Sequence, residues 1–356
     1  MDSDLRQALQ AGRVIPAHPL ALDANGRFDE RRQRTLTRYY AAAGAGGLAV
    51  GVHTTQFAIR HPSVGLFEPL LSLTREEMDR ADARSGTRLI RIGGICGRTD
   101  QALAEADLLA RLGYHAGLLS LAALADEDDT ALIAHCDAVA ARLPLVGFYL
   151  QPSVGGRILS YDFWRRFAEI PAVVAVKIAP FDRYRTLDVV RAVIDAGRDD
   201  IALYTGNDDS IVSDLVTPFR FTRRDSHPDG VVVERHIVGG LLGHWAVWTR
   251  SAVRLLGRCQ AAARAGEIPV GLLREGAEIT DANAAFFDAA HGFAGCVAGI
   301  QEMLRRQGLL ASARCLDPDE KLSPGQAAEI VRVCRAYPHL SDDEFVAAGL
   351  QEWMSC

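Results

Sequence analysis

Short apolar segments alternate with amphipathic, helix-forming segments along the first 265 residues of this chain, and this alternation limits the folds it can adopt. The predicted strands span 14–20, 48–55, 88–95, 116–121, 145–150, 173–180, 201–204 and 236–241, and predicted helices span 29–43, 100–111, 126–142, 161–169, 186–196 and 246–265. A further helix is predicted to begin at Thr74, with Glu77 at the capping-box spacing. Strands that are apolar on both faces and separated by helices are typical of parallel sheets. Eight such units predict a closed (β/α)8 TIM barrel, and an open doubly wound sheet is the alternative.

From about residue 266 onward the predicted strands stop and only helical segments follow, at 272–290, 293–307, 324–336 and 342–353. A chain of 356 residues exceeds the size of about 250–300 residues at which single cores stop growing. We therefore expect a barrel domain over residues 1–265 and an all-helical C-terminal domain over residues 266–356. The polar stretch 223–230, within the irregular region 217–235, is predicted to be an exposed loop.

The composition narrows the class of ligand. Apolar residues make up 49% of the chain and charged residues 24%, which is ordinary for a soluble globular protein, and no apolar run is long enough to span a membrane. A formal charge of −6 gives no reason to expect nucleic acid as a partner.

The acidic N-terminal segment does not have the pattern of a secretory signal, and seven scattered cysteines indicate a reducing compartment. We expect a cytoplasmic protein that binds a small molecule and neither nucleic acid nor a membrane.

One predicted strand contains a lysine that is out of place among its neighbours. The segment Val173–Pro180 is otherwise made of β-branched and small apolar residues, and Lys177 and Lys321 are the only lysines among 39 Lys and Arg residues. Arginine therefore serves wherever a cation is enough. Because an amine can lose its proton and attack a carbonyl, whereas a guanidinium stays charged, Lys177 is a candidate nucleophile. The structural alternative is a lysine whose stem packs in the core and whose tip reaches water.

The other candidates lie where predicted strands end, because (β/α)8 barrels collect function at the carboxyl ends of their strands. These ends carry Thr54 and Thr55, Tyr149, Lys177, Gly206 and Asp208. An amine, a phenol and hydroxyls suit Schiff-base chemistry: the amine adds to a ketone, a proton relay removes water, and the cationic imine stabilises a carbanion. This chemistry requires neither a metal nor another cofactor.

Each candidate also has a structural interpretation. Tyr149 can be a buried aromatic residue bonded to a carbonyl, and threonines are common at strand ends for structural reasons. Asp208 and Asp209 can cap the helix that follows them. The histidines have no metal-ligand spacing with cysteines or carboxylates, so no metal site is predicted.

The order of these residues resembles the dihydrodipicolinate synthase and N-acetylneuraminate lyase family. The matching segments are Gly51–Thr55, Phe148–Ser153, Val176–Lys177 and Thr205–Asp208, and the resemblance covers about residues 12–307. It implies a barrel with a C-terminal helical domain, usually in a homotetramer, and an imine between the strand-six lysine and pyruvate or another 2-oxo acid. By this resemblance Lys177 forms the imine, Tyr149 shuttles protons, and Thr54 and Thr55 meet the keto-acid carboxylate and relay protons. Gly206 and Asp208 match positions that contact substrate hydroxyls in the lyase branch.

The chain also departs from the family pattern. Gln56 and Phe57 follow the threonine pair where the family commonly has Gly-Glu, and Val154 stands where the synthase branch has an arginine that grips the second substrate's carboxylate. Arg157, three residues further on, is either a substitute or a solvated loop residue. The tyrosine that neighbouring subunits lend in the synthase branch has no clear equivalent near Leu119–Ala122. These differences argue against a role in lysine biosynthesis.

Two classes of function remain open at this point. The first is a Schiff-base lyase, either an aldolase or a dehydratase, that acts on a 2-oxo acid such as pyruvate or a 2-keto-3-deoxy sugar acid. A true synthase that condenses pyruvate with aspartate semialdehyde is the alternative within this class. The second class is a barrel that binds a small carboxylate without catalysis. The combination of Lys177, Tyr149 and Thr54 favours the first class.

Overall fold

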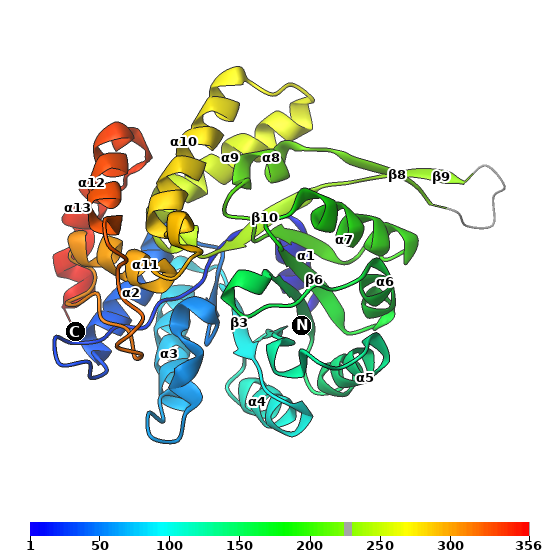
Figure 1. The fold of residues 1–356 in the computed structure, drawn as a ribbon, viewed down its shortest axis with the longest axis horizontal. Helices are drawn as coiled ribbons and strands as arrows, with labels where there is room; N and C mark the ends of the chain where they lie inside the picture. Colours follow the sequence, from blue (N-terminus) through cyan, green and yellow to red (C-terminus); the bar gives the residue numbers. More distant parts are fainter. Residues whose placement is uncertain (224–229, 356) are drawn as a thin grey trace. The chain divides into compact units, whose positions relative to one another are not determined.

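The computed structural model describes residues 1–223 and 230–355, and the strands of this part form one large sheet and one hairpin. The sheet has the order β1-β10-β7-β6-β5-β4-β3-β2, and its pairs β2–β3, β4–β5, β5–β6, β6–β7 and β7–β10 are parallel. Its strands are β1 Val14–Pro16, β2 Gly47–Val50, β3 Ile90–Ile95, β4 Ala116–Leu119, β5 Leu145–Leu150, β6 Val173–Ala179, β7 Ala202–Thr205 and β10 Ile237–Leu242. β1 and β2, at the two ends of this order, are joined by hydrogen bonds from Gly46 N to Val14 O and from His18 N to Ala49 O. The sheet is thus nearly closed, with helices between its strands, and the predicted (β/α)8 barrel is confirmed (Figure 1).

The helices that follow the strands are α2 Glu30–Ala43, α3 Phe67–Ser85, α4 Thr99–Arg111, α5 Asp129–Ala140, α6 Tyr161–Glu169, α7 Arg183–Asp195, α8 Ile211–Val216 and α9 Thr249–Ala265. Some of them begin at residues whose side chains cap them, namely α2, α5, α6 and α7. The Asp29 side chain accepts a hydrogen bond from Arg32 N at the start of α2, and the helix stops at Gly44 in the left-handed region. Ser160 caps α6 in the same way through Phe163 N. Side chains of these two types satisfy backbone N–H groups that a helix start leaves unpaired.

The C-terminal region is helical, as predicted. It contains α10 Val270–Phe286, α11 Cys296–Arg306, α12 Gln326–Ala336 and α13 Asp343–Met354. Helix α13 lies against α2 (Figure 1), where Arg38 donates a hydrogen bond of 2.8 Å to the Trp353 carbonyl and Tyr39 donates one of 2.7 Å to Asp342. Helix α1, Ser3–Gln10, was not predicted, and it buries Leu5 and Leu9.

The described chain divides into two compact units, each made of segments that are distant in sequence. Unit 1 comprises residues 1–13, 94–240 and 258–273, and unit 2 comprises residues 14–93, 241–257 and 274–356. Unit 1 contains β4 to β7 and the hairpin, whereas unit 2 contains β1, β2 and helices α2, α3, α11, α12 and α13. The predicted domain boundary at residues 265 and 266 stays a prediction.

Three details of the sequence interpretation are corrected by the structure. Thr74 lies inside α3 and does not begin it, because the apolar segment before it continues the helix back to Phe67. The second strand ends at Val50, and Thr54 and Thr55 lie in the 3-10 turn His53–Thr55 that follows it.

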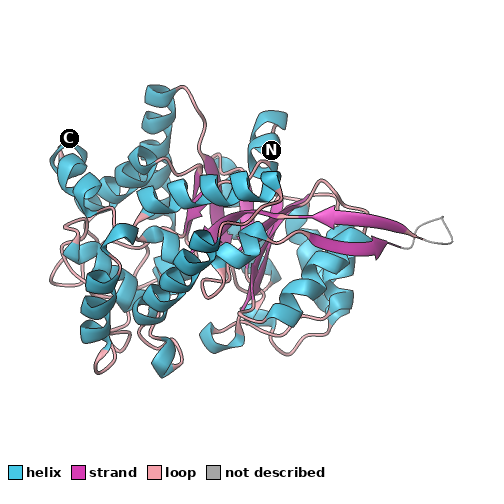
Figure 2. Ribbon diagram, turned by 90° about the horizontal axis from the view of Figure 1, so that it is seen from above, coloured by secondary structure: helices cyan, strands magenta, loops and turns pink. Residues whose placement is uncertain are grey.

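The third correction concerns the region 217–235, which was predicted to be irregular. It contains an antiparallel hairpin of β8 Phe219–Arg223 and β9 Val231–Arg235, whose two strands are drawn in magenta in Figure 2. The hairpin packs on α7 (Figure 1). Alternating side chains explain the hairpin, because Phe219 and Phe221 share one face while Arg220 and Thr222 share the other. Residues 224–229 of the predicted loop lie outside the described residues.

Candidate functional site

Lys177 lies within β6, in which all seven residues are buried, and only 8% of its surface is exposed. Its partners in the sheet are Phe148 on β5 and Tyr204 on β7. The Lys177 Nζ atom lies 4.4 Å from the centroid of the Phe148 ring, which is a cation–π distance. Lys321, in contrast, is exposed. The buried lysine predicted from the sequence is therefore present, and an aromatic face lies beside its amine.

Gly206 forms one wall of the space around the Lys177 side chain. It follows β7 directly, and its N–H donates a hydrogen bond of 2.7 Å to Ile178 O on β6. A Cβ atom at this position would lie 2.7 Å from both Lys177 Cε and Ala179 Cβ, which is too close for any side chain. Position 206 therefore needs glycine to leave room for the lysine.

Asp208 is buried in the turn after Gly206, and its N–H donates a hydrogen bond of 3.1 Å to the Gly206 carbonyl. Asp209, its neighbour, is exposed. The next helix, α8, begins after Ser210, and no side chain caps it by a hydrogen bond. The N-cap residue of α8 is Ser210, and the capping role considered for Asp208 and Asp209 stays a prediction.

A buried carboxylate, Asp214, lies in the same region and was missed by the sequence interpretation. It accepts hydrogen bonds from Thr205 Oγ1 at 2.6 Å and Asn207 Nδ2 at 3.0 Å, and an ion pair of 2.6 Å joins it to Arg183. Burial raises the pKa of the Asp214 carboxyl, although Arg183 opposes this shift. An available signal was the single acid within the apolar helix Ile211–Val216, which is comparable to the single lysine in β6.

Tyr149 lies on the other face of β5 from the side chain of Phe148. Its hydroxyl donates to Leu159 O and accepts from Leu159 N, both at 3.2 Å. Its ring packs on Trp164 of α6, with 5.4 Å between the ring centroids. Burial raises the pKa of the Tyr149 hydroxyl. The structure thus places Phe148, rather than Tyr149, beside Lys177, and the proton-shuttling role of Tyr149 stays a prediction.

Thr54 and Thr55 belong to unit 2, and both are buried. The Thr55 hydroxyl donates a hydrogen bond of 2.7 Å to His18 O and accepts one of 3.0 Å from Gly51 N. The His18 ring is itself bonded to Thr37 and Gln33, and burial lowers the pKa of His18 to about 4. Thr55 therefore closes the turn after β2, which is a structural role alongside the predicted contact with a carboxylate.

Arg157, the candidate replacement for the arginine absent at Val154, is half-buried in unit 1. Its guanidinium donates to the carbonyl oxygens of Leu124 and Glu127, the second at 3.0 Å. The guanidinium therefore stabilises the loop before α5, and two of its N–H groups already donate to backbone carbonyls rather than to a substrate carboxylate.

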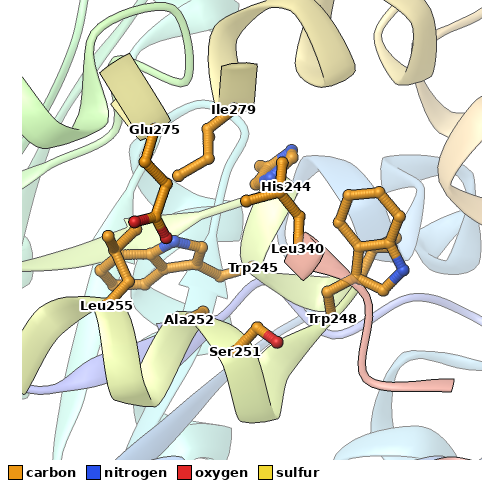
Figure 3. Close-up of a pocket in the computed structure, with 10 residues that line it drawn as sticks. His244, Trp245, Trp248, Ser251, Ala252, Leu255, Glu275, Ile279 and Leu340 are labelled. Carbon is orange, nitrogen blue, oxygen red and sulfur yellow. The ribbon is translucent and has the colours of Figure 1, made fainter. Parts of the chain in front are cut away.

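A pocket of unit 2 lies beyond the carboxyl end of β10 (Figure 3). His244, Trp245 and Trp248 come from the segment after this strand, and Glu275 and Ile279 of α10 line the same pocket. Burial lowers the pKa of His244 to about 4, so its ring is neutral near pH 7. Thr54 and Thr55 belong to the same unit, but other residues line this pocket.

Within residues 1–223 and 230–355, no group of three or more His, Cys, Asp or Glu side chains is arranged to hold a metal ion. No helix of this part of the chain is both long and apolar enough to cross a membrane.

Unit 1 brings together an amine in an apolar strand, a glycine wall and a buried acid. This set can form a covalent adduct with a small carbonyl compound.

Comparison with solved structures identifies the fold. The chain matches a dihydrodipicolinate synthase from Cyanidioschyzon merolae with lysine bound, at 19% identity and a TM-score of 0.70, over 92% of this chain and 98% of that one. It matches CdNal from Clostridium difficile in complex with mannosamine at 16% identity and a TM-score of 0.68, over 92% of this chain and 99% of the other. It also matches YagE, a prophage protein of the dihydrodipicolinic acid synthase family from E. coli K12 in complex with pyruvate. This match has 15% identity and a TM-score of 0.69, over 92% of this chain and 97% of the other.

No family model and no curated protein matches the sequence. At identities below 20%, the structural matches establish the architecture alone. This chain therefore has the fold of the dihydrodipicolinate synthase family structures, barrel and helical C-terminal part included.

Proposed function

We propose that this protein is a class I lyase that forms a Schiff base between Lys177 and a 2-oxo acid, such as pyruvate or a 2-keto-3-deoxy sugar acid. The single observation that carries the proposal is the placement of Lys177, a buried amine in an apolar strand with a glycine wall at its stem. The solved structure of YagE with pyruvate, which has the same fold, supports a 2-oxo acid as the ligand.

The proposed reaction begins when the neutral Lys177 amine attacks the carbonyl carbon of the substrate. An apolar surrounding favours the neutral amine, and loss of water from the carbinolamine gives a protonated imine. The imine cation then accepts an electron pair in one of two ways. In cleavage, the hydroxyl on the fourth substrate carbon loses its proton and the bond between the third and fourth carbons breaks. In dehydration, the third carbon loses a proton, and the hydroxyl on the fourth carbon takes up a proton and leaves as water. The Phe148 ring, 4.4 Å from Nζ, would stabilise the cationic imine by about 0.5–2 kcal/mol.

The other predicted residues have subsidiary roles in this proposal. Gly206 and Asp208 would contact hydroxyls of the substrate beyond the imine, while Thr54 and Thr55 would meet its carboxylate and Thr54 would relay protons. The Tyr149 hydroxyl is bonded to the Leu159 backbone on the other face of β5. The proposal therefore rests on Lys177 rather than on a Lys177–Tyr149 pair. By resemblance to the family, we also propose a homo-oligomer, with a tetramer as the expected state, which sedimentation will test.

The main competitor is a true synthase that condenses pyruvate with aspartate semialdehyde. Such an enzyme must hold a second carboxylate, and an arginine gives the strongest contact for it. Val154 cannot supply that contact, and the Arg157 guanidinium donates to the carbonyls of Leu124 and Glu127. Losing a charge-assisted contact of about 1.5–3 kcal/mol should lower the rate with a second carboxylate by about 10–150-fold.

Steady-state rates with a substrate panel will test this proposal. The panel contains aspartate semialdehyde with pyruvate and several 2-keto-3-deoxy acids, and pyruvate release and dehydration are both followed. We expect the highest kcat/KM with a 2-keto-3-deoxy acid and no activity in Lys177→Arg, which keeps the charge but loses the nucleophile. The highest efficiency with the semialdehyde would establish a synthase instead. No turnover of any member, together with tight 2-oxo acid binding, would establish the non-catalytic carboxylate-binding barrel.

A further inference from the structure

Asp214 is the centre of a buried polar cluster that lies behind the turn after β7. The cluster consists of Asp214, Thr205, Asn207, Arg183 and Thr186. Asp214 has no exposed surface, and each of its carboxylate oxygens accepts at least one hydrogen bond. A carboxylate that is buried with several donors holds those donors in place, because leaving any of them unpaired in the core is costly.

The cluster joins the two loops that follow β6 and β7. Asn207 Nδ2 donates to Asp214 and, at 3.0 Å, to the Thr186 hydroxyl on α7. The Asn207 Oδ1 atom accepts a hydrogen bond of 3.0 Å from Phe181 N, and Phe181 has a φ of +52°, in the left-handed region. A phenylalanine adopts this conformation only where its surroundings hold it there. Asp214 thus orients Asn207, which in turn holds the strained Phe181 in the loop between β6 and α7.

Gly206 connects this cluster to the nucleophile, because it lies between Thr205 and Asn207. Both neighbours donate side-chain hydrogen bonds to the same Asp214 oxygen. A Cβ at position 206 would be 2.7 Å from Lys177 Cε, so the glycine backbone is in close contact with the lysine stem. A shift of the 205–207 segment would therefore allow the amine to move away from its productive position.

We propose that Asp214 is a positioning residue for the reaction at Lys177, acting through Thr205 and Asn207 on the contact between Gly206 and the lysine stem. This inference rests on the proposed imine chemistry. Asp214 does not touch the substrate. Asp214 keeps the 205–207 segment in place, so that Gly206 stays in contact with the lysine stem and the amine stays where it can attack the carbonyl carbon. Misplacement of reacting groups by about 1 Å can cost about 100-fold in rate, so the effect is measurable.

The first test is the rate of imine formation per folded molecule of Asp214→Asn. The amide can present its oxygen either to Thr205 and Asn207 or to Arg183, so one part of the cluster loses its acceptor. With saturating pyruvate, we expect borohydride trapping at Lys177 to slow by about 10–100-fold, while the pyruvate concentration for half-maximal trapping changes less than about threefold. Asp188→Asn is the matched control, because Asp188 is an α7 acid that pairs with the exposed Arg191 and is not among the residues of the Asp214 cluster. It should trap at the wild-type rate.

A second pair of variants keeps the proposal testable where Asp214→Asn does not fold. Thr205→Val removes the hydroxyl donor to Asp214 with little change of shape, whereas Thr205→Ser keeps that donor. We expect Thr205→Val to slow trapping by about tenfold and Thr205→Ser to stay within about twofold of wild type. Equal rates in the two variants, or a wild-type rate per folded molecule in Asp214→Asn, would overturn the positioning role. Failure of the proposed function gives a different result, namely no trapping in the wild-type protein with any 2-oxo acid.

Discussion

His18 and His244 are buried in unit 2, and burial lowers the pKa of each to about 4. In the unfolded chain a histidine has a pKa of about 6.5, so below pH 6.5 the unfolded state binds more protons than the folded state. The stability that each neutral ring contributes is therefore fully present above about pH 6.5 and is lost as the pH falls towards 4.

The lowered pKa values of the two histidines predict that the protein loses stability as the pH falls, and that His18→Gln loses less. Each histidine should lower the free energy of unfolding by about 2 kcal/mol between pH 7.5 and pH 5. We expect His18→Gln to lose about 2 kcal/mol less than wild type over this range, as measured by urea unfolding at both pH values. His61→Gln, at an exposed histidine, is the control and should show the wild-type loss. An equal loss in all three proteins would show that His18 does not titrate with folding.

The hydroxyl of Tyr149 gives the second prediction at this scale. Because it exchanges hydrogen bonds with the Leu159 backbone, Tyr149→Phe should lower the free energy of unfolding by about 1–2 kcal/mol. The rate of borohydride trapping at Lys177 should stay within about threefold of wild type. Tyr204→Phe, which removes a hydrogen bond to Leu9 O, should cost similar stability. A trapping rate lowered by about 10²–10⁴-fold in Tyr149→Phe would instead establish the acid–base role that the resemblance implies.

At the level of elements, the pairing of β5 with β6 explains why Lys177 could be predicted from the sequence, whereas Phe148, the aromatic residue beside its amine, could not. A lysine inside an apolar strand is visible without any structure. Its partner depends on an irregularity near the start of the pair, where Leu145 pairs with Val173 but Val146 pairs with Ala175. Without this shift Tyr149 would pair with Lys177, and with it Phe148 does. A one-residue slip moves side chains to the other face of a strand, and a bulge leaves no clear signal in apolar residues.

The end of β7 supplies a prediction about the same wall. Gly206→Ala introduces a methyl group 2.7 Å from Lys177 Cε and Ala179 Cβ, so neighbouring atoms must shift. We expect a loss of about 1–3 kcal/mol in stability and trapping at Lys177 at least tenfold slower. Gly257→Ala in α9 is the control, because a Cβ there meets nothing within 4 Å, and it should stabilise the protein by up to about 1 kcal/mol. Wild-type trapping in Gly206→Ala would contradict the proposed close fit.

At the scale of the whole molecule, the strand–helix alternation predicted the barrel and the helical C-terminal region correctly. Apolar strands and helix-capping residues such as Asp29 and Ser160 are local signals, and they fixed most elements to within a few residues. The single acid of α8 was visible in the sequence, but its partner Arg183 and the two compact units could not be predicted, because they depend on contacts between separate segments of the chain. Local patterns carry no information about such contacts.

The composition of unit 2 predicts the behaviour of a truncated chain. The unit contains residues 14–93 together with residues 274–356, and within it Arg38 and Tyr39 of α2 bind Trp353 O and Asp342. A fragment of residues 1–265 would expose the apolar residues of α2 that α13 covers. We expect this fragment to show no cooperative urea transition, whereas the full chain shows one. A sharp transition in the fragment would support residues 1–265 as an independent domain.

The central claim is that Lys177 forms an imine with a 2-oxo acid, and reductive trapping tests it most directly. The protein is treated with borohydride in the presence of pyruvate, or of another 2-oxo acid, and the modified peptide is located by mass spectrometry. We expect one adduct per chain, on Lys177, with none in Lys177→Arg and none when the 2-oxo acid is omitted. An adduct on Lys321, or no adduct with any 2-oxo acid, would contradict the proposed function.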